Sequence, residues 1–82
     1  MKHSSESPRP HEVALAKQIE VEMVEHDLSQ GKLAEAIGIS RGAMNRYLNN
    51  HRTFDYGQIV DIAAVFGLTA GELIRRAESR LQ

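Results

Sequence analysis

The chain has 82 residues, of which 41% are hydrophobic and 26% charged, with a formal net charge of −1 and no cysteine. This length allows one small domain with a modest core, and the absence of cysteine excludes disulfides and thiolate metal sites. No apolar run approaches the roughly 20 residues that a membrane-spanning helix needs, so we expect no contact with a membrane.

The charged residues are unevenly distributed along the chain. Residues 12–27 hold five carboxylates and one lysine, whereas residues 29–54 hold one glutamate and four cations, Lys32, Arg41, Arg46 and Arg52. Phosphate is attracted by the local field rather than by the total charge. The net charge of −1 therefore does not exclude binding to nucleic acid.

The first ten residues are polar and include two prolines and three serines. This composition predicts a flexible N-terminal arm over residues 1–10, followed by one domain over residues 11–82. Lys2 and Arg9 could contact DNA from such an arm, although a solvated tail is the simpler interpretation.

A first helix is predicted over residues 11–27. The apolar residues that recur there at spacings of three and four are Val13, Ala16, Ile19 and Met23, with Val24 alongside. We expect the carboxylates of this helix to form a solvated face. Glu22 and His26, four residues apart, are expected to be a surface pair rather than a metal site.

Two short helices are predicted next, each with a polar residue before its first turn. Ser29 and Ser40 are the expected N-caps, because a serine hydroxyl can accept a hydrogen bond from an early backbone N–H. Gly38 is expected to end the first of these helices in the left-handed conformation. The second should run to about Asn49, with Asn50 as its left-handed stop.

Residues 51–54 form a predicted connector to two further helices. Asp55 with Gln58, and Thr69 with Glu72, have the spacing of a capping box. The apolar faces of the two helices consist of Ile59, Ile62, Ala63 and Phe66, and of Leu73, Ile74, Ala77 and Leu81. With no strand-like alternation anywhere, the sequence predicts a compact all-α domain of five helices.

The second and third helices have the pattern of a helix-turn-helix. The apolar residues at the positions where these two helices would touch are Leu33, Ala34, Ile37, Ile39, Met44 and Tyr47. The other face of the third helix carries Arg41, Asn45 and Arg46. Such an apolar seam with a projecting polar helix is how a recognition helix, here residues 40–49, is presented to the DNA major groove.

The wider pattern resembles the lambda-repressor-like (Xre family) helix-turn-helix domain over roughly residues 19–75. The matching positions are Leu28-Ser29-Gln30, Leu33-Ala34, Gly38-Ile39-Ser40, Met44, Tyr47, Ile59, Ile62-Ala63, Phe66-Gly67-Leu68-Thr69 and Glu72-Leu73. The resemblance implies a sequence-specific regulator of transcription, a repressor that binds a double-stranded DNA operator as a dimer. It also implies a cytoplasmic, nucleoid-associated protein.

Three positions depart from the family pattern. Met23 and Leu48 stand where many members pair an arginine with a glutamate, so we expect an apolar contact between them. Such a replacement need not destabilise the fold, since buried ion pairs are often no better than packed apolar residues. Asn50 replaces the usual glycine, and Gly42 stands where many relatives have a polar side chain that contacts a base.

The base-reading residues are expected on the third helix. Arg41 can bond guanine O6 and N7, and Asn45, one turn later, can bond adenine N6 and N7. Arg46 can read a base or bind a phosphate, and Gly42 allows close approach of the backbone. The alternative is an ordinary solvated polar face.

Phosphate contacts are expected from the residues around this helix. Gln30 lies at the start of the second helix, where free N–H groups and the helix dipole favour an anion. The full expected set is Ser29, Gln30, Ser40, Asn49, Asn50, His51 and Arg52. Gln30 could instead be an ordinary surface residue, and His51 an exposed loop residue.

Ile74 and Leu81 on the fifth helix are the expected dimerisation residues, unless both pack inside their own domain. A different class of function, an antitoxin that sequesters a toxin and regulates its own operon, is the alternative. A protein partner such as a toxin or an inducer is left open. No catalytic residue, cofactor or metal site is predicted, so we expect no enzyme.

Overall fold

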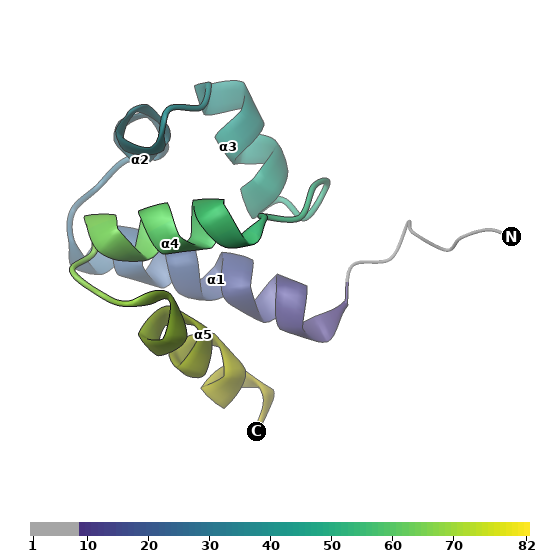
Figure 1. Cartoon of the computed structure of the whole chain (residues 1–82). Helices are drawn as coiled ribbons and strands as arrows, with labels where there is room; N and C mark the ends of the chain where they lie inside the picture. Colours follow the sequence, from purple (N-terminus) through teal and green to yellow (C-terminus); the bar gives the residue numbers. More distant parts are fainter. Residues whose placement is uncertain (1–8) are drawn as a thin grey trace, which may run out of the picture.

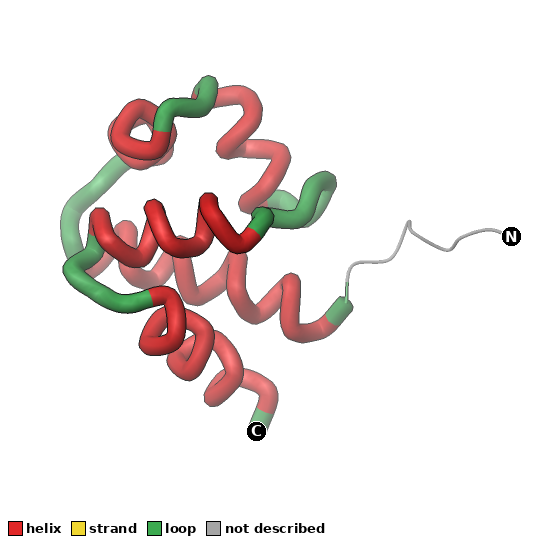
Figure 2. Tube along the Cα trace, in the orientation of Figure 1, coloured by secondary structure: helices red, strands yellow, loops and turns green. Residues whose placement is uncertain are grey.

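Five α-helices and one short 3-10 helix make up residues 9–82, the part of the chain that the computed structural model describes (Figures 1 and 2). They are α1 (Pro10–Glu25), α2 (Gln30–Ile37), α3 (Arg41–Leu48), α4 (Tyr56–Val65), α5 (Ala70–Glu78) and η1 (Ser79–Leu81). Residues 9–82 contain no strand, which confirms the predicted all-α fold of five helices. In the view of Figure 1, α2 and α3 lie above α1 and α4, and α5 lies below them.

Each of the four later helices starts at a side-chain cap, as predicted. The caps are Ser29, Ser40, Asp55 and Thr69, and each accepts a hydrogen bond of 2.8–3.2 Å from the N–H three residues later. Both expected capping boxes also form, because Gln58 and Glu72 accept hydrogen bonds from the N–H groups of Asp55 and Thr69 at 2.9 and 2.8 Å. These bonds satisfy donors that the helices themselves leave free.

Four helices end at a residue in the left-handed conformation. These residues are Asp27 (φ 53°), Gly38 (φ 78°), Asn50 (φ 65°) and Gly67 (φ 73°). Each is followed by a residue whose N–H bonds the carbonyl five positions earlier, which is the Schellman pattern of helix ends. The stops at Gly38 and Asn50 were expected. The stop at Asp27 was not, and it ends α1 at Glu25 rather than at the predicted residue 27.

The start of α1 also differs from the prediction by one residue. Pro10 is the first helical residue and Arg9 is the extended residue before it. Proline suits this position because its missing N–H has no helical partner there. The predicted arm therefore loses Pro10 to the helix. The rest of the arm, including Lys2, lies outside the described residues apart from Arg9.

One fully buried side chain from each helix meets at the centre of the domain. These side chains are Ile19, Leu33, Met44, Ile62 and Leu73, all 0% exposed. Full burial of a Leu, Ile or Met side chain contributes roughly 1.5–3 kcal/mol, so each member of this cluster contributes substantially to stability. Around it lie Tyr47, Leu48, Phe54 and Phe66.

Two valines of α1 were wrongly expected on the core face. Val13 is 41% exposed and Val24 is 82% exposed. The reason is that α5 packs against α1 and moves its covered face toward Gln18 and Glu22, which are 7% and 2% exposed. At 100° per residue, Val13 and Val24 then lie on the opposite side of the helix.

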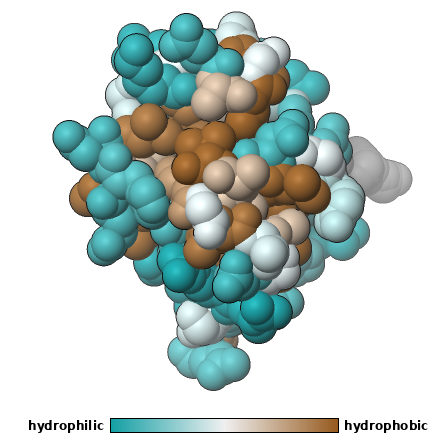
Figure 3. Space-filling model, turned by 60° about the vertical axis from the view of Figure 1, so that its left-hand side comes forward, coloured by the Kyte–Doolittle hydropathy of each residue, from teal (hydrophilic) through white to brown (hydrophobic). Residues whose placement is uncertain are grey.

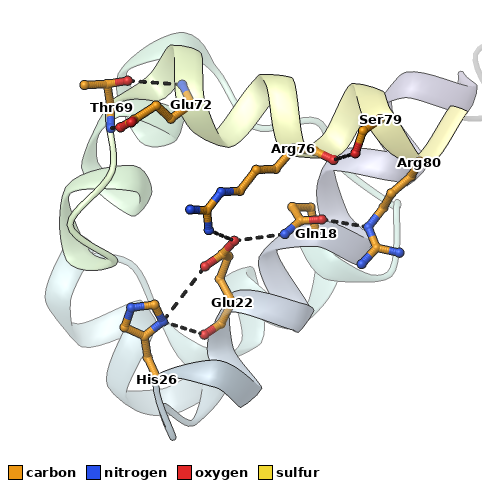
Figure 4. A network of polar contacts seen from close by, with 8 residues as sticks. All are labelled: Gln18, Glu22, His26, Thr69, Glu72, Arg76, Ser79 and Arg80. Carbon is orange, nitrogen blue, oxygen red and sulfur yellow. Dashed lines mark hydrogen bonds and ion pairs between the residues drawn. The ribbon is translucent and has the colours of Figure 1, made fainter. Parts of the chain in front are cut away.

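The face of α1 that α5 covers holds a polar network around the buried side chains of Gln18 and Glu22 (Figure 4). Glu22 accepts hydrogen bonds from Arg76 Nη1 at 2.7 Å and from Gln18 Nε2 at 2.9 Å, and Arg80 Nε donates to Gln18 Oε1 at 2.7 Å. His26 Nδ1 lies 4.0 Å from Glu22 Oε1. The expected solvated acidic face is therefore wrong for Glu22, because a residue 54 positions later provides its partner.

Burial alone would raise the pKa of Glu22, but the hydrogen bonds and positive charge of Arg76, the amide of Gln18 and nearby His26 outweigh it and lower the pKa below the ordinary 4.5. The carboxylate of Glu22 is thus held in its charged form. The hydrogen bond to Glu22 and the negative charge of that carboxylate raise the pKa of Arg76.

No single helix of residues 9–82 is long and apolar enough to cross a membrane. By length and composition a span would need α4 together with α5 and η1, and a 94° bend separates the two.

We predict that Glu22→Gln lowers the free energy of unfolding by about 1–3 kcal/mol at pH 7. The substitution removes the negative charge that Arg76 pairs with, and it does so at the buried end of the ion pair. Since the pKa of Glu22 is lower in the folded than in the unfolded chain, its stabilisation is present above about pH 4.5 and is lost as pH falls through the folded pKa. The loss on substitution should therefore shrink at pH 3. Urea unfolding followed by circular dichroism at both pH values measures it.

Glu25→Gln is the matched control, because Glu25 is on the same helix and exposed. An equal loss in Glu25→Gln, or a Glu22→Gln loss as large at pH 3 as at pH 7, would contradict the role given to the pair.

Candidate nucleic-acid interface

α3 is anchored by one face and open on the other. Met44, Tyr47 and Leu48 are 0%, 6% and 4% exposed and pack into the core. Arg41, Gly42, Asn45 and Arg46, the expected base-reading residues, are all exposed. The structure thus brings this set together on one outward surface of an eight-residue helix.

The turn between α2 and α3 fixes how α3 projects. Gly38 is left-handed, and Ile39 N–H bonds Ala34 O at 3.0 Å. Ala34, expected where the two helices cross, is 1% exposed, and Ile39 is partly buried against the core. A larger side chain at residue 34 would separate the two helices.

The first turns of α2 and α3 lie close together. A Cβ atom placed on Gly31 would be 3.9 Å from Arg41 Cδ, so the Arg41 side chain passes over the start of α2. Gln30, half-buried, is the first residue of α2. The positive end of the α2 dipole and the Arg41 guanidinium therefore favour an anion in the same region.

Ser29 and Ser40, expected at phosphate, are exposed N-caps. Each hydroxyl oxygen accepts from a backbone N–H, at 3.2 Å from Lys32 N and 3.0 Å from Ala43 N. A hydroxyl keeps its own hydrogen when it accepts, so both serines can still donate to a phosphate oxygen.

The loop after α3 is held by contacts that local sequence pattern does not reveal. The Tyr47 ring stacks on Phe54 with centroids 4.6 Å apart, and the Tyr47 hydroxyl accepts from Gln58 Nε2 at 3.1 Å. The Arg52 guanidinium lies 5.0 Å from the centre of the same ring. This cation–π contact places the exposed charge of Arg52 beside the end of α3.

The other expected phosphate residues also lie at this end of α3. Asn50 is the left-handed residue and His51 N–H bonds Arg46 O at 2.9 Å, with the His51 side chain exposed. Asn49 differs from its neighbours, because its amide nitrogen is already bonded to Asn45, at 2.9 Å to the backbone oxygen and 3.1 Å to Oδ1.

Met23 and Leu48 are both buried in one cluster where α1 packs on α3, as the expected apolar contact requires. The expected dimerisation residues lie on or after α5: Ile74 is half-buried and Leu81 is 50% exposed. Within residues 9–82, no three His, Asp or Glu side chains are grouped as a metal site would need.

These features, a short anchored helix with a basic and amide-bearing outer face after a left-handed glycine turn, define a helix-turn-helix DNA-binding domain. Residues 15–73 match the family model described as helix-turn-helix. The chain belongs to this Xre-type, lambda-repressor-like family and is a DNA-binding transcriptional regulator.

The fold is also similar to that of the crystal structure of ClgR, the clp gene regulator of Corynebacterium glutamicum. The TM-score is 0.79 at 16% sequence identity, over 89% of this chain and 77% of the ClgR chain. At this identity the likeness concerns the fold alone. No match was found among curated proteins.

Two glycines near α3 should respond in opposite ways to alanine. Gly38→Ala is expected to lower the free energy of unfolding by about 1 kcal/mol, because alanine is strained at a φ of 78°. Gly42→Ala should raise it by up to about 1 kcal/mol, since Gly42 is helical and a Cβ there meets nothing nearer than Ser40 Oγ at 4.0 Å. Urea unfolding measures both, and stabilisation by Gly38→Ala would contradict the turn geometry.

Proposed function

We propose that this regulator is a repressor that binds a double-stranded DNA operator with α3 in the major groove. The observation that carries the proposal is the division of α3 into a buried face, Met44 and Tyr47, and an exposed face with Arg41, Asn45 and Arg46. Such a role places the protein in the cytoplasm, at the nucleoid.

Base choice in this proposal rests on the exposed face of α3. Arg41 donates to guanine O6 and N7, and Asn45 bonds adenine N6 and N7. Arg46 bonds a base or a phosphate. Gly42, which has no side chain, lets the α3 backbone lie close to the base edges.

Register on the duplex is set by contacts to phosphate, which position the protein without reading sequence. On one side of α3 these come from Ser29, Gln30 and Ser40 at the two helix starts. On the other side they come from the loop after α3, with Asn50, His51 and the charge of Arg52.

We further propose that two copies bind two half-sites about 34–36 Å apart, one helical turn of DNA. Leu81, at 50% exposed, supplies apolar surface in η1, next to the C-terminus, and Figure 1 shows the C-terminus on the side of the molecule away from α3. Ile74 borders a hollow of about 290 Å3 with Leu15, Phe54 and Ile59, which a partner side chain can enter. Apolar residues also gather on the face that Figure 3 shows, in which the left-hand side of Figure 1 is turned toward the reader.

The base and phosphate roles predict different effects of two arginine substitutions. Against an operator selected from random DNA, Arg41→Ala should cost about 1–3 kcal/mol and relax choice at one base pair. Arg52→Ala should weaken all sequences alike and reduce the salt slope by about 1. Fluorescence anisotropy titrations at several salt concentrations measure both.

Arg75→Ala is the control for lost charge, because Arg75 is exposed on α5. Thermal unfolding of Arg52→Ala checks that loss of the Tyr47 contact has not unfolded the loop. Uniform weakening by Arg41→Ala with altered base choice in Arg52→Ala would reverse the assigned roles.

The dimer is tested by sedimentation of the protein alone and with operator. Leu81→Ser should lower the sedimentation coefficient of the complex on DNA with two half-sites and leave binding to a single half-site unchanged. Val24→Ser, which removes an exposed valine on α1, should change neither the sedimentation coefficient nor the half-site affinity. A wild-type monomer on two half-sites would contradict the dimer.

A further inference from the structure

We infer that Asn49 is a positioning residue that fixes the side-chain amide of Asn45 in one orientation and thereby makes α3 select adenine. The inference rests on the proposed function, since it concerns the base that Asn45 faces. It gives Asn49 a task other than the phosphate contact expected from the sequence.

The first step is that the orientation of the Asn49 amide is determined. An amide can turn by 180° and exchange its nitrogen and oxygen, but only nitrogen can donate to a carbonyl. Asn49 Nδ2 lies 2.9 Å from the backbone oxygen of Asn45, so nitrogen must face that carbonyl.

The second step passes this orientation to Asn45. The same Asn49 Nδ2 lies 3.1 Å from Asn45 Oδ1. If Asn45 turned over, its own nitrogen would face the nitrogen of Asn49, and two donors cannot bond one another. Asn45 Oδ1 is therefore kept on the Asn49 side and Nδ2 on the other.

The third step concerns Asn49 itself. An amide nitrogen has two hydrogens, and two acceptors on Asn45 engage them. The only side-chain polar atom of Asn49 that remains is Oδ1, which is an acceptor and cannot bond the oxygens of a phosphate. A phosphate contact by Asn49 would thus require it to release Asn45.

The consequence for base choice follows from the major-groove edges. Adenine presents the N6 donor beside the N7 acceptor, whereas guanine presents two acceptors, O6 and N7. An amide with Oδ1 fixed needs a donor opposite that oxygen and an acceptor opposite Nδ2, as adenine provides. At guanine, Oδ1 would face O6, and turning the amide would only place Oδ1 against N7, so guanine can bond only one of the two amide atoms. Holding the amide in the orientation that adenine bonds at both atoms removes motion that binding would otherwise have to arrest, and this favours adenine. Both asparagines are exposed in the free protein, and DNA would remove water and strengthen their bond.

The test uses the operator base pair at which Asn45→Ala changes the sequence preference of the protein. At that base pair, the affinity for an operator with adenine is compared with the affinity for an operator with guanine. We expect Asn49→Ala to lower the adenine-to-guanine ratio about 3- to 10-fold, a share of the discrimination that one bidentate amide contact supplies. In the Asn45→Ala background, Asn49→Ala should change the ratio less than twofold. Asn49→Asp, which has no donor for either oxygen of Asn45, should lower the ratio as well.

Phosphate contact is the competing role, and it gives a different result. It predicts that Asn49→Ala weakens binding to all sequences equally, flattens the salt dependence and acts undiminished in the Asn45→Ala background. Arg52→Ala provides the reference for that behaviour. This pattern, or an unchanged adenine-to-guanine ratio in a folded Asn49→Ala protein, would overturn the inference.

Two further measurements distinguish a failure of the inference from a loss of folding and from a failure of the proposed function. Circular dichroism checks folding, and Asn49→Ser replaces Asn49→Ala if that variant unfolds, because serine also lacks the amide. If Arg41→Ala changes base choice but no base pair responds to Asn45→Ala, the inference fails and the proposed function stands. If no DNA sequence is selected at all, the proposed function fails.

Discussion

The position of α3 depends on the shared burial of five side chains, one from each helix. Helices of eight residues, such as α2 and α3, are not stable alone in water, because nucleation costs more than so few hydrogen bonds return. Met44 and Leu33, both 0% exposed, join these helices to α1, α4 and α5. The outward polar face of α3 is thus a product of the core beneath it, and changes in the core act on DNA binding through the angle of this helix.

Much of the fold could be predicted because its signals are local. Ser29, Ser40, Asp55 and Thr69 each cap a helix within three residues of themselves, and Gly38 ends α2 where the sequence placed it. The left-handed conformation of Asp27 was harder to predict. Aspartate adopts this conformation only occasionally, and whether it does so depends on contacts with the rest of the fold. Local pattern therefore located the helices but was least reliable at their ends: α5 stops at Glu78, three residues before Leu81, which was expected on the same helix and lies in η1 instead.

Contacts between distant residues could not be predicted in the same way. The periodicity of α1 predicts that Glu22 lies on a solvated polar face. Its burial depends on Arg76 and thus on how α5 crosses α1. The outer face of α3 was predictable, since position around a helix follows from spacing. The Asn45–Asn49 bonds were not, because four-residue spacing permits them without deciding which amide atoms meet. The contact of Arg52 with Tyr47 likewise depends on the path of the loop.

The bonds of Glu22 with Arg76 and of Gln18 with Arg80 have a kinetic consequence. They join residues 54 and 62 positions apart, whereas α2 and α3 pack within twenty residues of sequence. Bringing α5 onto α1 closes a loop of most of the chain and requires the largest loss of chain entropy. We therefore expect the carboxylate of Glu22 to stay hydrated until α5 packs on α1, so that its desolvation follows the collapse that forms the helix-turn-helix.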